Sequence, residues 1–176
     1  QLDLLKLLNE RHMQRRGMDE RLAARIHSIE QAFRMKDTVE EAFDLSRESE
    51  ATRARYGKGA YAEMCLLARR LSERGVRMVQ PFHSIKAGWD SHKDNDKLQA
   101  KCTLETDQPI AALLKDLKER GLLDETLVIW SGEFGRTPMN EERNGSKFLG
   151  RDHHPHCYTM WMAGGGVRAG FDYGQT

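Results

Sequence analysis

Residues 126–130 (TLVIW) constrain the fold more than any other stretch, because every position after Thr126 is apolar. A strand with one face in solvent alternates apolar and polar residues, whereas a continuous apolar run is typical of a strand covered on both faces. Such strands occur in parallel sheets that are wrapped by helices. The run therefore predicts a buried strand within an α/β domain.

The segment just before this strand has the pattern of a helix. Its apolar residues recur at positions i, i+3, i+4 and i+7 between Ile110 and Leu117. Pro109 suits the first turn of such a helix, and Gly121 suits its end. Residues 60–74 carry a similar apolar face and predict an earlier helix of the same kind.

Two more strands are predicted from short runs rich in β-forming residues. Residues 76–80 form one run and stop at Pro81, where the ladder must weaken because proline has no N–H to donate. Residues 158–162 form the other and lead into the glycines at 164–166. The order helix, strand, loop, helix, strand, loop, strand indicates α/β architecture, with a mixed or parallel sheet flanked by helices.

The first third of the chain contains no proline and predicts helices. Apolar residues recur at helical spacing over residues 22–33, and we expect this stripe to face the core rather than a partner. Gly17 and Asp19 are typical of a helix end followed by the N-cap of the next helix. We therefore divide the chain into a helical segment, residues 1–56, that packs on the core, and an α/β part, residues 57–176.

Composition limits the classes of function. The 176 residues are 39% hydrophobic and the net charge is +1, so no overall field would attract nucleic acid or an anionic membrane. No apolar run is long enough to span a membrane, and the N-terminus lacks the pattern of a signal peptide. The sequence starts within a helical pattern and ends without a terminal element, which predicts a fragment of a larger domain. No pattern in it indicates an oligomeric state.

Three cysteines are present, at positions 65, 102 and 157. Their odd number and the absence of a Cys-x-x-Cys pair exclude a disulfide scaffold and a thiolate zinc finger. We expect free, buried thiols. The alternative is one cross-link between Cys102 and Cys157 in an exported protein.

Candidate functional residues gather in the two loops that follow the predicted strands at 76–80 and 126–130. In open α/β sheets, functional groups lie beyond the carboxyl ends of the strands. Five of the seven histidines lie in these loops, at positions 83, 92, 153, 154 and 156. Histidine and carboxylate together are ligands of Zn²⁺, Mn²⁺ or Fe, whereas Ca²⁺ and Mg²⁺ prefer oxygen alone. We therefore expect Zn²⁺ or Mn²⁺ ahead of Ca²⁺ or Mg²⁺.

Each candidate also has a plain structural interpretation. Asp90 and His92 are candidate metal ligands or belong to a solvated loop with a capping carboxylate. Residues 152–156 (Asp-His-His-Pro-His), with three imidazoles and a carboxylate, predict metal or anion binding, and the alternative is a polar surface turn. Glu133 lies between glycines that let a ligand approach the backbone, or it belongs to a structural turn. Arg136 would clamp an oxyanion or pair with a carboxylate.

Several of these segments resemble known proteins. Residues 109–130 resemble the helix and strand that lead to the C-terminal metal motif of sulfatases. Residues 132–138 (GEFGRTP), 150–154 (GRDHH) and 161–166 (WMAGGG) resemble more closely an uncharacterised bacterial family, domain-of-unknown-function family fifteen-oh-one. This family is grouped with the alkaline phosphatase and sulfatase superfamily, and the resemblance covers nearly the whole chain.

The resemblance implies a sulfatase-like α/β fold and metal-dependent hydrolysis of phosphate or sulfate esters, with a small-molecule or glycan substrate. By position, Glu133 would replace the strand-end Asp ligand of the superfamily, and Arg136 would add charge to the transition state. The implied metal ligands are Asp90, His92, Glu133, Asp152, His153 and His154. The family also implies a periplasmic or secreted setting for the full-length protein.

Two departures from the superfamily pattern define the alternatives. Phe134 stands at a position where a metal ligand is expected, and the expected nucleophile would precede Gln1. One alternative is a non-catalytic module that binds a metal or a sulfated glycan and has lost the hydrolytic chemistry. Another is an interaction protein in which the N-terminal helices dock a partner and the histidines are merely polar.

Overall fold

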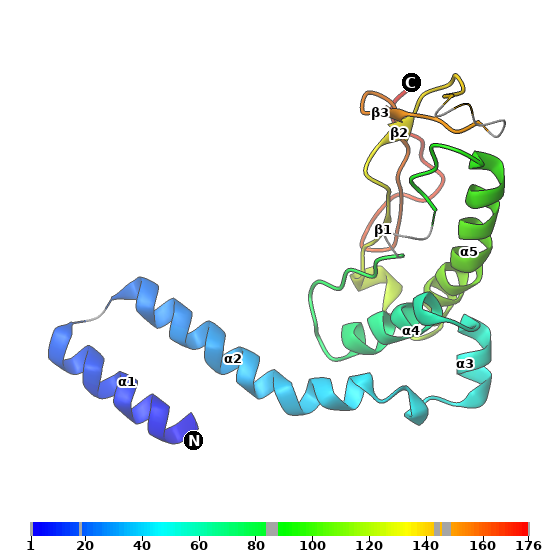
Figure 1. The fold of residues 1–176 in the computed structure, drawn as a ribbon. Helices are drawn as coiled ribbons and strands as arrows, with labels where there is room; N and C mark the ends of the chain where they lie inside the picture. The colour runs from blue at the N-terminus through cyan, green and yellow to red at the C-terminus, as the bar shows by residue number, and fades with distance from the viewer. Residues whose placement is uncertain (1, 18, 84–87, 143–144, 146–148, 176) are drawn as a thin grey trace. The chain divides into compact units, whose positions relative to one another are not determined.

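The computed structural model describes residues 2–17, 19–83, 88–142, 145 and 149–175. Figure 1 traces the chain as a ribbon. The chain forms two compact units, Gln1–Asp44 and Leu45–Thr176. The sequence analysis placed its division at residue 56 instead. The elements just after residue 44 contact the helices of the second unit, so they belong to that unit.

The first unit consists of α1 (Leu2–Arg16) and α2 (Glu20–Phe43). Gly17 follows α1 with a φ of 82°, a conformation that glycine adopts without steric cost. The side chain of Asp19 accepts hydrogen bonds of 2.9 and 3.3 Å from backbone N–H groups in the first turn of α2. The predicted helix end and N-cap are therefore confirmed.

The apolar stripe of α2 is only partly covered. Leu22 and Ile26 are half-buried, but Ile29 and Phe33 are 61% and 50% exposed. Within the first unit, the N-terminal half of the stripe is therefore the covered part, and packing of the stripe against the core stays a prediction.

The second unit begins with a helical layer. Its elements are η1 (Leu45–Arg47), α3 (Glu50–Tyr56), α4 (Ala60–Glu73), α5 (Asn95–Glu119) and η2 (Leu123–Glu125). α4 packs against α5, and α3 contacts both of them (Figure 1). The helix predicted over residues 60–74 is confirmed by α4. The buried apolar residues at this junction are Tyr56, Ala62, Cys65, Leu66 and Ala112.

α5 is longer than predicted. Residues 95–101 were assigned to a polar loop, and Pro109 was assigned to a first turn, yet the helix starts at Asn95 and continues through Pro109. An internal proline removes one i→i−4 hydrogen bond. Burial of Cys102 and Thr106, which are 0% and 4% exposed, holds the polar first half of the helix against the unit.

After η2 the strands of the unit are short. In the described residues these are β1 (Val128–Trp130), β2 (Gly135–Arg136), β3 (His153–His154) and β4 (Trp161–Ala163). β1 pairs with β4 and β2 pairs with β3, and both pairs are antiparallel. The content is α/β as expected, but these strands do not form the mixed or parallel alkaline phosphatase-like sheet.

Two details explain why the sheet differs from the expectation. Ile129 and Met162 lie opposite each other in the β1–β4 pair and are 54% and 44% exposed, so one face of the apolar run is open. On the other face Trp130 stacks on Trp161 with ring centroids 6.4 Å apart. The strand predicted at residues 76–80 is wrong, because no described strand pairs with it and an extended run needs a ladder partner.

A buried network of ion pairs holds the helical layer together around Arg69 of α4, which is 1% exposed. Its Nη1 donates a hydrogen bond of 2.6 Å to Glu73. Its other nitrogens form ion pairs at 2.7 Å with Glu48 and at 3.0 Å with Asp116. Arg120 contacts Glu73 at 2.6 Å and Asp116 at 2.7 Å. These contacts connect η1, α4 and α5.

Further contacts complete this Arg69 network. Arg70 pairs with Glu48, and the hydroxyl of Tyr56 donates a hydrogen bond of 3.0 Å to Asp116. The network opposes three guanidinium groups to three carboxylates, namely Arg69, Arg70 and Arg120 to Glu48, Glu73 and Asp116. Burial alone would raise the pKa of Glu48 and of Asp116, but the hydrogen bonds from arginines outweigh it and lower both pKa values.

Candidate metal centre

The candidate ligands come from separate segments of the second unit. Asp90 and His92 lie on the segment just before α5, Glu133 lies between β1 and β2, and His153 lies in β3. In the β2–β3 pair, Arg136 lies opposite His153. This pairing joins the loop that follows β1 to the segment that carries the adjacent histidines.

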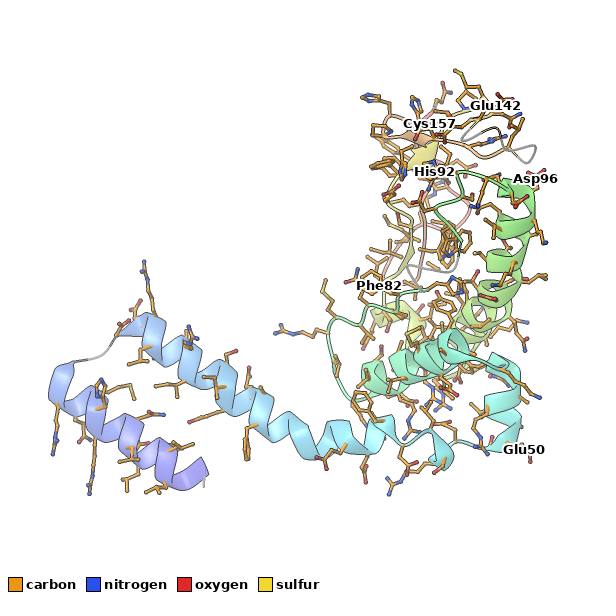
Figure 2. All side chains as sticks on the ribbon, viewed as in Figure 1. Glu50, Phe82, His92, Asp96, Glu142 and Cys157 are labelled. Carbon is orange, nitrogen blue, oxygen red and sulfur yellow. The ribbon has the colours of Figure 1, made fainter. Side chains whose placement is uncertain are left out.

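Gly135 lets the β2–β3 pair pack closely against the turn that follows β3. A Cβ at this position would lie 1.5 Å from the carbonyl oxygen of Cys157, so any larger residue would displace the backbone. Figure 2 shows Cys157 and His92 at the same end of the second unit. The glycine therefore helps to fix β3 where it presents His153.

Asp90 is the centre of the arrangement. Its Oδ1 lies 2.9 Å from Nε2 of His92 and 3.1 Å from Nε2 of His153. It also accepts a hydrogen bond of 2.7 Å from Nη2 of Arg136. Three positively charged or polar groups therefore converge on one carboxylate oxygen.

A second carboxylate lies behind each ring. Nδ1 of His92 lies 2.8 Å from Oε2 of Glu141, and Nδ1 of His153 contacts Oε1 of Glu133. Each imidazole thus lies between two carboxylates, one of which is the shared Asp90. The rings themselves are neighbours, with centroids 5.1 Å apart.

These partners limit the protonation of the rings. A neutral imidazole has one donor and one acceptor nitrogen, whereas a carboxylate only accepts. The contacts of His92 and His153 are satisfied if both rings are imidazolium, or if each donates from Nδ1 and a shared cation replaces the Nε2 protons. The second arrangement is the one that a bound metal ion would require, because each ring then has a lone pair on Nε2.

The donor set fits a divalent transition metal. The candidate ligand atoms of Asp90, His92 and His153 all lie within 4.8 Å of one another. Two imidazole nitrogens with one carboxylate oxygen are typical of Zn²⁺, Mn²⁺ and Fe²⁺ sites with open coordination positions. The side chain of Asp90 is 60% exposed, so solvent reaches this Asp90 cluster.

Arg136 is engaged by the protein on both sides of its guanidinium. Nη2 donates to Asp90, and Nη1 donates a hydrogen bond of 3.1 Å to the carbonyl oxygen of Arg151. The hydrogen bond from Arg136 is the main cause that lowers the pKa of Asp90, and the charges of the two imidazoles act in the same direction. The structure thus contains the carboxylate pairing considered for Arg136. Its oxyanion role stays a prediction.

Asp152 lies beside the Asp90 cluster. Its ligand atom, with those of His92 and Glu141, forms a second group whose members lie within 4.8 Å of one another. Its Oδ1 accepts a hydrogen bond of 2.8 Å from the backbone N–H of His153. Asp152 therefore joins the same region as the predicted ligands, but in contact with the Glu141 side of it.

Three other residues of interest lie outside the group formed by Asp90, His92 and His153. They are Glu133, His154 and Phe134. Glu133 contacts the ring nitrogen of His153 that faces away from Asp90, so it lies behind a candidate ligand. His154 is in neither group of described residues, and its ring lies 5.8 Å from that of His156. Phe134 packs edge-on against His153, with ring centroids 5.7 Å apart.

The segment that carries Asp90 is fixed by its neighbours. The indole N–H of Trp89 donates a hydrogen bond of 2.8 Å to Nδ1 of His83, and Nε2 of His83 lies 3.1 Å from Glu105 of α5. Nε2 of Gln99 donates to the carbonyl oxygen of Trp89 at 3.0 Å. His83 was noted among the loop histidines, and the structure gives it a supporting place outside the cluster.

Glu141 is the residue that sequence reasoning missed. It lies in a polar stretch without a helical or strand pattern, and its place depends on an isolated antiparallel bridge to Gly150. A bridge between two single residues leaves no periodicity in a sequence. The only signal is its type, a carboxylate within reach of the histidine-rich segment.

The whole chain matches one known protein family. A family model described as Protein of unknown function (DUF1501) matches residues 1–176. No curated protein and no solved structure matches the chain. In the part of the chain that the structure describes, no helix is long and apolar enough to cross a membrane.

Proposed function

The chain belongs to the DUF1501 family of proteins of unknown function, and from this premise we propose that it is a metal-dependent hydrolase-type domain acting on phosphate or sulfate esters. The observation that carries the proposal is the convergence of Asp90, His92 and His153 within 4.8 Å. A divalent ion bound there would neutralise ester oxygens and lower the pKa of an attacking group. Zn²⁺ and Mn²⁺ suit these donors best.

The local charge supports a cation. Among the described residues, four carboxylates lie near the two rings: Asp90, Glu133, Glu141 and Asp152. A divalent ion between the rings would attract these negative charges, and this attraction supports the proposal.

The ester class rests on sequence resemblance. Residues 132–138 and 150–154 resemble segments of a family grouped with the alkaline phosphatase and sulfatase superfamily. Within that proposal the substrate is a small-molecule or glycan ester, and the full-length protein acts in the periplasm or outside the cell. Arg136, held beside Asp90 by a hydrogen bond of 2.7 Å, would keep that ligand ionised.

One observation favours a second candidate, a non-catalytic module that binds a metal or a sulfated glycan. A hydrolase of this type needs a nucleophile. Among the described residues, two hydroxyl groups that are adjacent in sequence to residues of the cluster are engaged by the protein. Ser91 is 1% exposed and donates to Asn95 at 2.7 Å, while Thr137 donates to the carbonyl oxygen of Met139 at 3.0 Å. Each of these hydroxyl groups therefore already has a protein partner.

Metal content tests the part that both candidates share. We would measure bound Zn²⁺ and Mn²⁺ by plasma mass spectrometry for the wild type, a His92→Ala/His153→Ala double variant, and a His27→Ala control. His27 is an exposed histidine of α2 in the other unit. We expect stoichiometric metal in the wild type and the control and its loss in the double variant. Absence of uptake by the wild type would overturn the proposal.

Ester turnover then separates the two candidates. The metal-loaded full-length protein would be assayed with p-nitrophenyl phosphate and p-nitrophenyl sulfate, before and after removal of the ion with a chelator. Hydrolysis that disappears with the ion supports the hydrolase. Stoichiometric metal without turnover of either ester supports the binding module.

A further inference from the structure

Glu141 lies behind His92, on the side of the ring that faces away from Asp90. Its Oε2 is 2.8 Å from Nδ1, and the opposite nitrogen, Nε2, is 2.9 Å from Oδ1 of Asp90. The side chains of His92 and Glu141 are 18% and 19% exposed. We infer that Glu141 is a positioning residue, which holds the His92 ring so that Nε2 faces the cation. This inference rests on the proposed metal centre.

The backbone around Glu141 is fixed by residues next to the cluster. The N–H of Glu141 donates to the carbonyl oxygen of Gly150 at 2.8 Å, and Gly150 is buried. A Cβ at Gly150 would lie 2.0 Å from the carbonyl carbon of His92, so the two backbones are in direct contact. The N–H of Arg151 donates to the carbonyl oxygen of Ser91 at 3.2 Å. Glu141 is thus held by the same segment that contacts its partner.

The chemistry of imidazole explains what this contact does. A ring that donates from Nδ1 to a carboxylate has its lone pair on Nε2, and the negative charge of the carboxylate makes that lone pair more basic. The hydrogen bond also prevents rotation of the ring about its χ2 bond. Glu141 therefore selects both the ligating nitrogen and its direction.

Glu133 has the equivalent place behind His153, but it is more exposed. Its side chain is 53% exposed, compared with 19% for Glu141. A contact in water is weaker than a partly buried one, because solvent screens its charge and competes for its hydrogen bonds. We therefore expect a larger effect from Glu141 than from Glu133.

Asp152 defines the arrangement that competes with this one. His92, Glu141 and Asp152 also place their ligand atoms within 4.8 Å of one another. If a cation bound there, Glu141 would be a ligand, and His92 would ligate through Nδ1 rather than Nε2. The tautomer of His92 in the metal-loaded protein therefore distinguishes the two arrangements.

Zinc affinity gives the first test. The full chain would be titrated with Zn²⁺ alone by calorimetry, as wild type, Glu141→Ala, Glu141→Gln and Glu142→Ala. Glu142 is the exposed neighbouring carboxylate and serves as the matched control. We expect Glu141→Ala to weaken binding by about 10–100-fold, the usual effect of losing a partner of a metal-bound histidine. Glu141→Gln keeps an acceptor for the Nδ1 proton and should restore part of the loss.

The second measurement reports the ring directly. Two-bond ¹H–¹⁵N spectra of the Zn²⁺-loaded protein distinguish a histidine protonated on Nδ1 from one protonated on Nε2, and a His92→Gln variant assigns the signal. We expect His92 protonated on Nδ1 in the wild type and in Glu141→Gln, and a mixture of ring states in Glu141→Ala. Circular dichroism of each variant verifies that the fold is retained.

The outcomes separate this inference from the proposal beneath it. If the wild type binds Zn²⁺ and Glu141→Ala binds it equally well, the metal centre stands and the role of Glu141 is wrong. If His92 is instead ligated through Nδ1, Glu141 is a ligand and the inference is also wrong. If the wild type binds no Zn²⁺, the metal centre itself is wrong and the inference falls with it.

Discussion

Two clusters of charged and polar groups lie in the second unit, and they differ in their cationic partners and in exposure. The Arg69 network opposes three guanidinium groups to three carboxylates around a side chain that is 1% exposed. The Asp90 cluster combines carboxylates with two imidazole rings and the guanidinium of Arg136, and the side chain of Asp90 is 60% exposed. One cluster is closed to solvent and contains permanent cations, whereas the other is open to solvent and contains imidazole groups.

The difference shows how similar groups can have structural or chemical roles. Buried arginine–carboxylate pairs fix helices only when every charge has a partner, because an unpaired buried charge is very costly. Solvent reaches the Asp90 cluster, so a ligand can enter it. The exposure of histidines and carboxylates that lie together is therefore the feature that distinguishes this candidate site from the Arg69 network.

The largest expected effect comes from breaking the Arg69 network. Arg69→Met would remove the buried guanidinium that Glu48 and Asp116 share, and the loss of one partner from a buried ion pair typically costs about 3–5 kcal/mol. The free energy of unfolding from urea denaturation measures this loss. Arg55→Met is the control, because Arg55 pairs with Glu119 at the surface and should give no resolvable change. Equal stability of the two variants would contradict the comparison.

The Asp90 cluster should respond to metal instead. At a free Zn²⁺ concentration of about 100 times its Kd, the folded state gains about 2.7 kcal/mol. A thermal unfolding scan with and without Zn²⁺ measures the gain. We expect it in the wild type, and we expect none in the His92→Ala/His153→Ala variant. An equal gain in that variant would place the metal elsewhere in the chain.

A substitution at Gly150 tests how the backbone of the Asp90 cluster is held. Gly150→Ala would force a Cβ against the backbone of His92, and overpacking of this kind costs about 1–3 kcal/mol. Zn²⁺ affinity should fall as well, because the displaced backbone carries a ligand. Gly132→Ala is the control, since a Cβ at Gly132 would meet no atom within 4 Å. If both substitutions had the same small effect, the close approach would not matter.

Acid should weaken the Arg69 network gradually. The pKa values of Glu48 and Asp116 are lowered in the folded protein, from 4.5 and 3.8 respectively, since hydrogen bonds from arginines outweigh their burial. The stability they contribute is present above these unfolded values and is lost as the pH falls through the lower folded values. Unfolding free energies measured from neutral pH to about pH 3 should therefore fall less steeply in Glu48→Gln. An unchanged slope would contradict the role of Glu48.

Local patterns predicted the helices, and non-local pairing limited the rest of the fold. The cap at Asp19 and the apolar face of α4 depend on neighbours within a few residues, so the sequence contains them. The pairing of β1 with β4 depends on residues more than thirty positions apart, and a continuous apolar run does not state which direction its partner takes. The run at 126–130 therefore predicted a strand, which β1 confirms over 128–130, but it did not predict the antiparallel pairing with β4.

The site was predicted by residue type and only partly by role. Asp90, His92 and His153 were identified because imidazole and carboxylate groups occurred near predicted strand ends, and the structure brings them together. Glu141 was missed, since its contact with His92 joins positions 49 residues apart and leaves no motif. Glu133 was expected as a ligand from family resemblance, but spacing cannot tell a ligand from the group behind it.

The three thiols differ in reactivity, and this difference provides a route for labelling. None of the three forms a disulfide in the described residues; Cys65 and Cys102 are buried and Cys157 is half-buried. Burial raises the pKa of Cys65 to about 11 and also raises that of Cys102, which suppresses their thiolate forms. A maleimide dye would therefore attach first to Cys157, whose carbonyl oxygen adjoins Gly135. A fluorescent label can thus be attached beside the β2–β3 pair without adding a cysteine to the sequence.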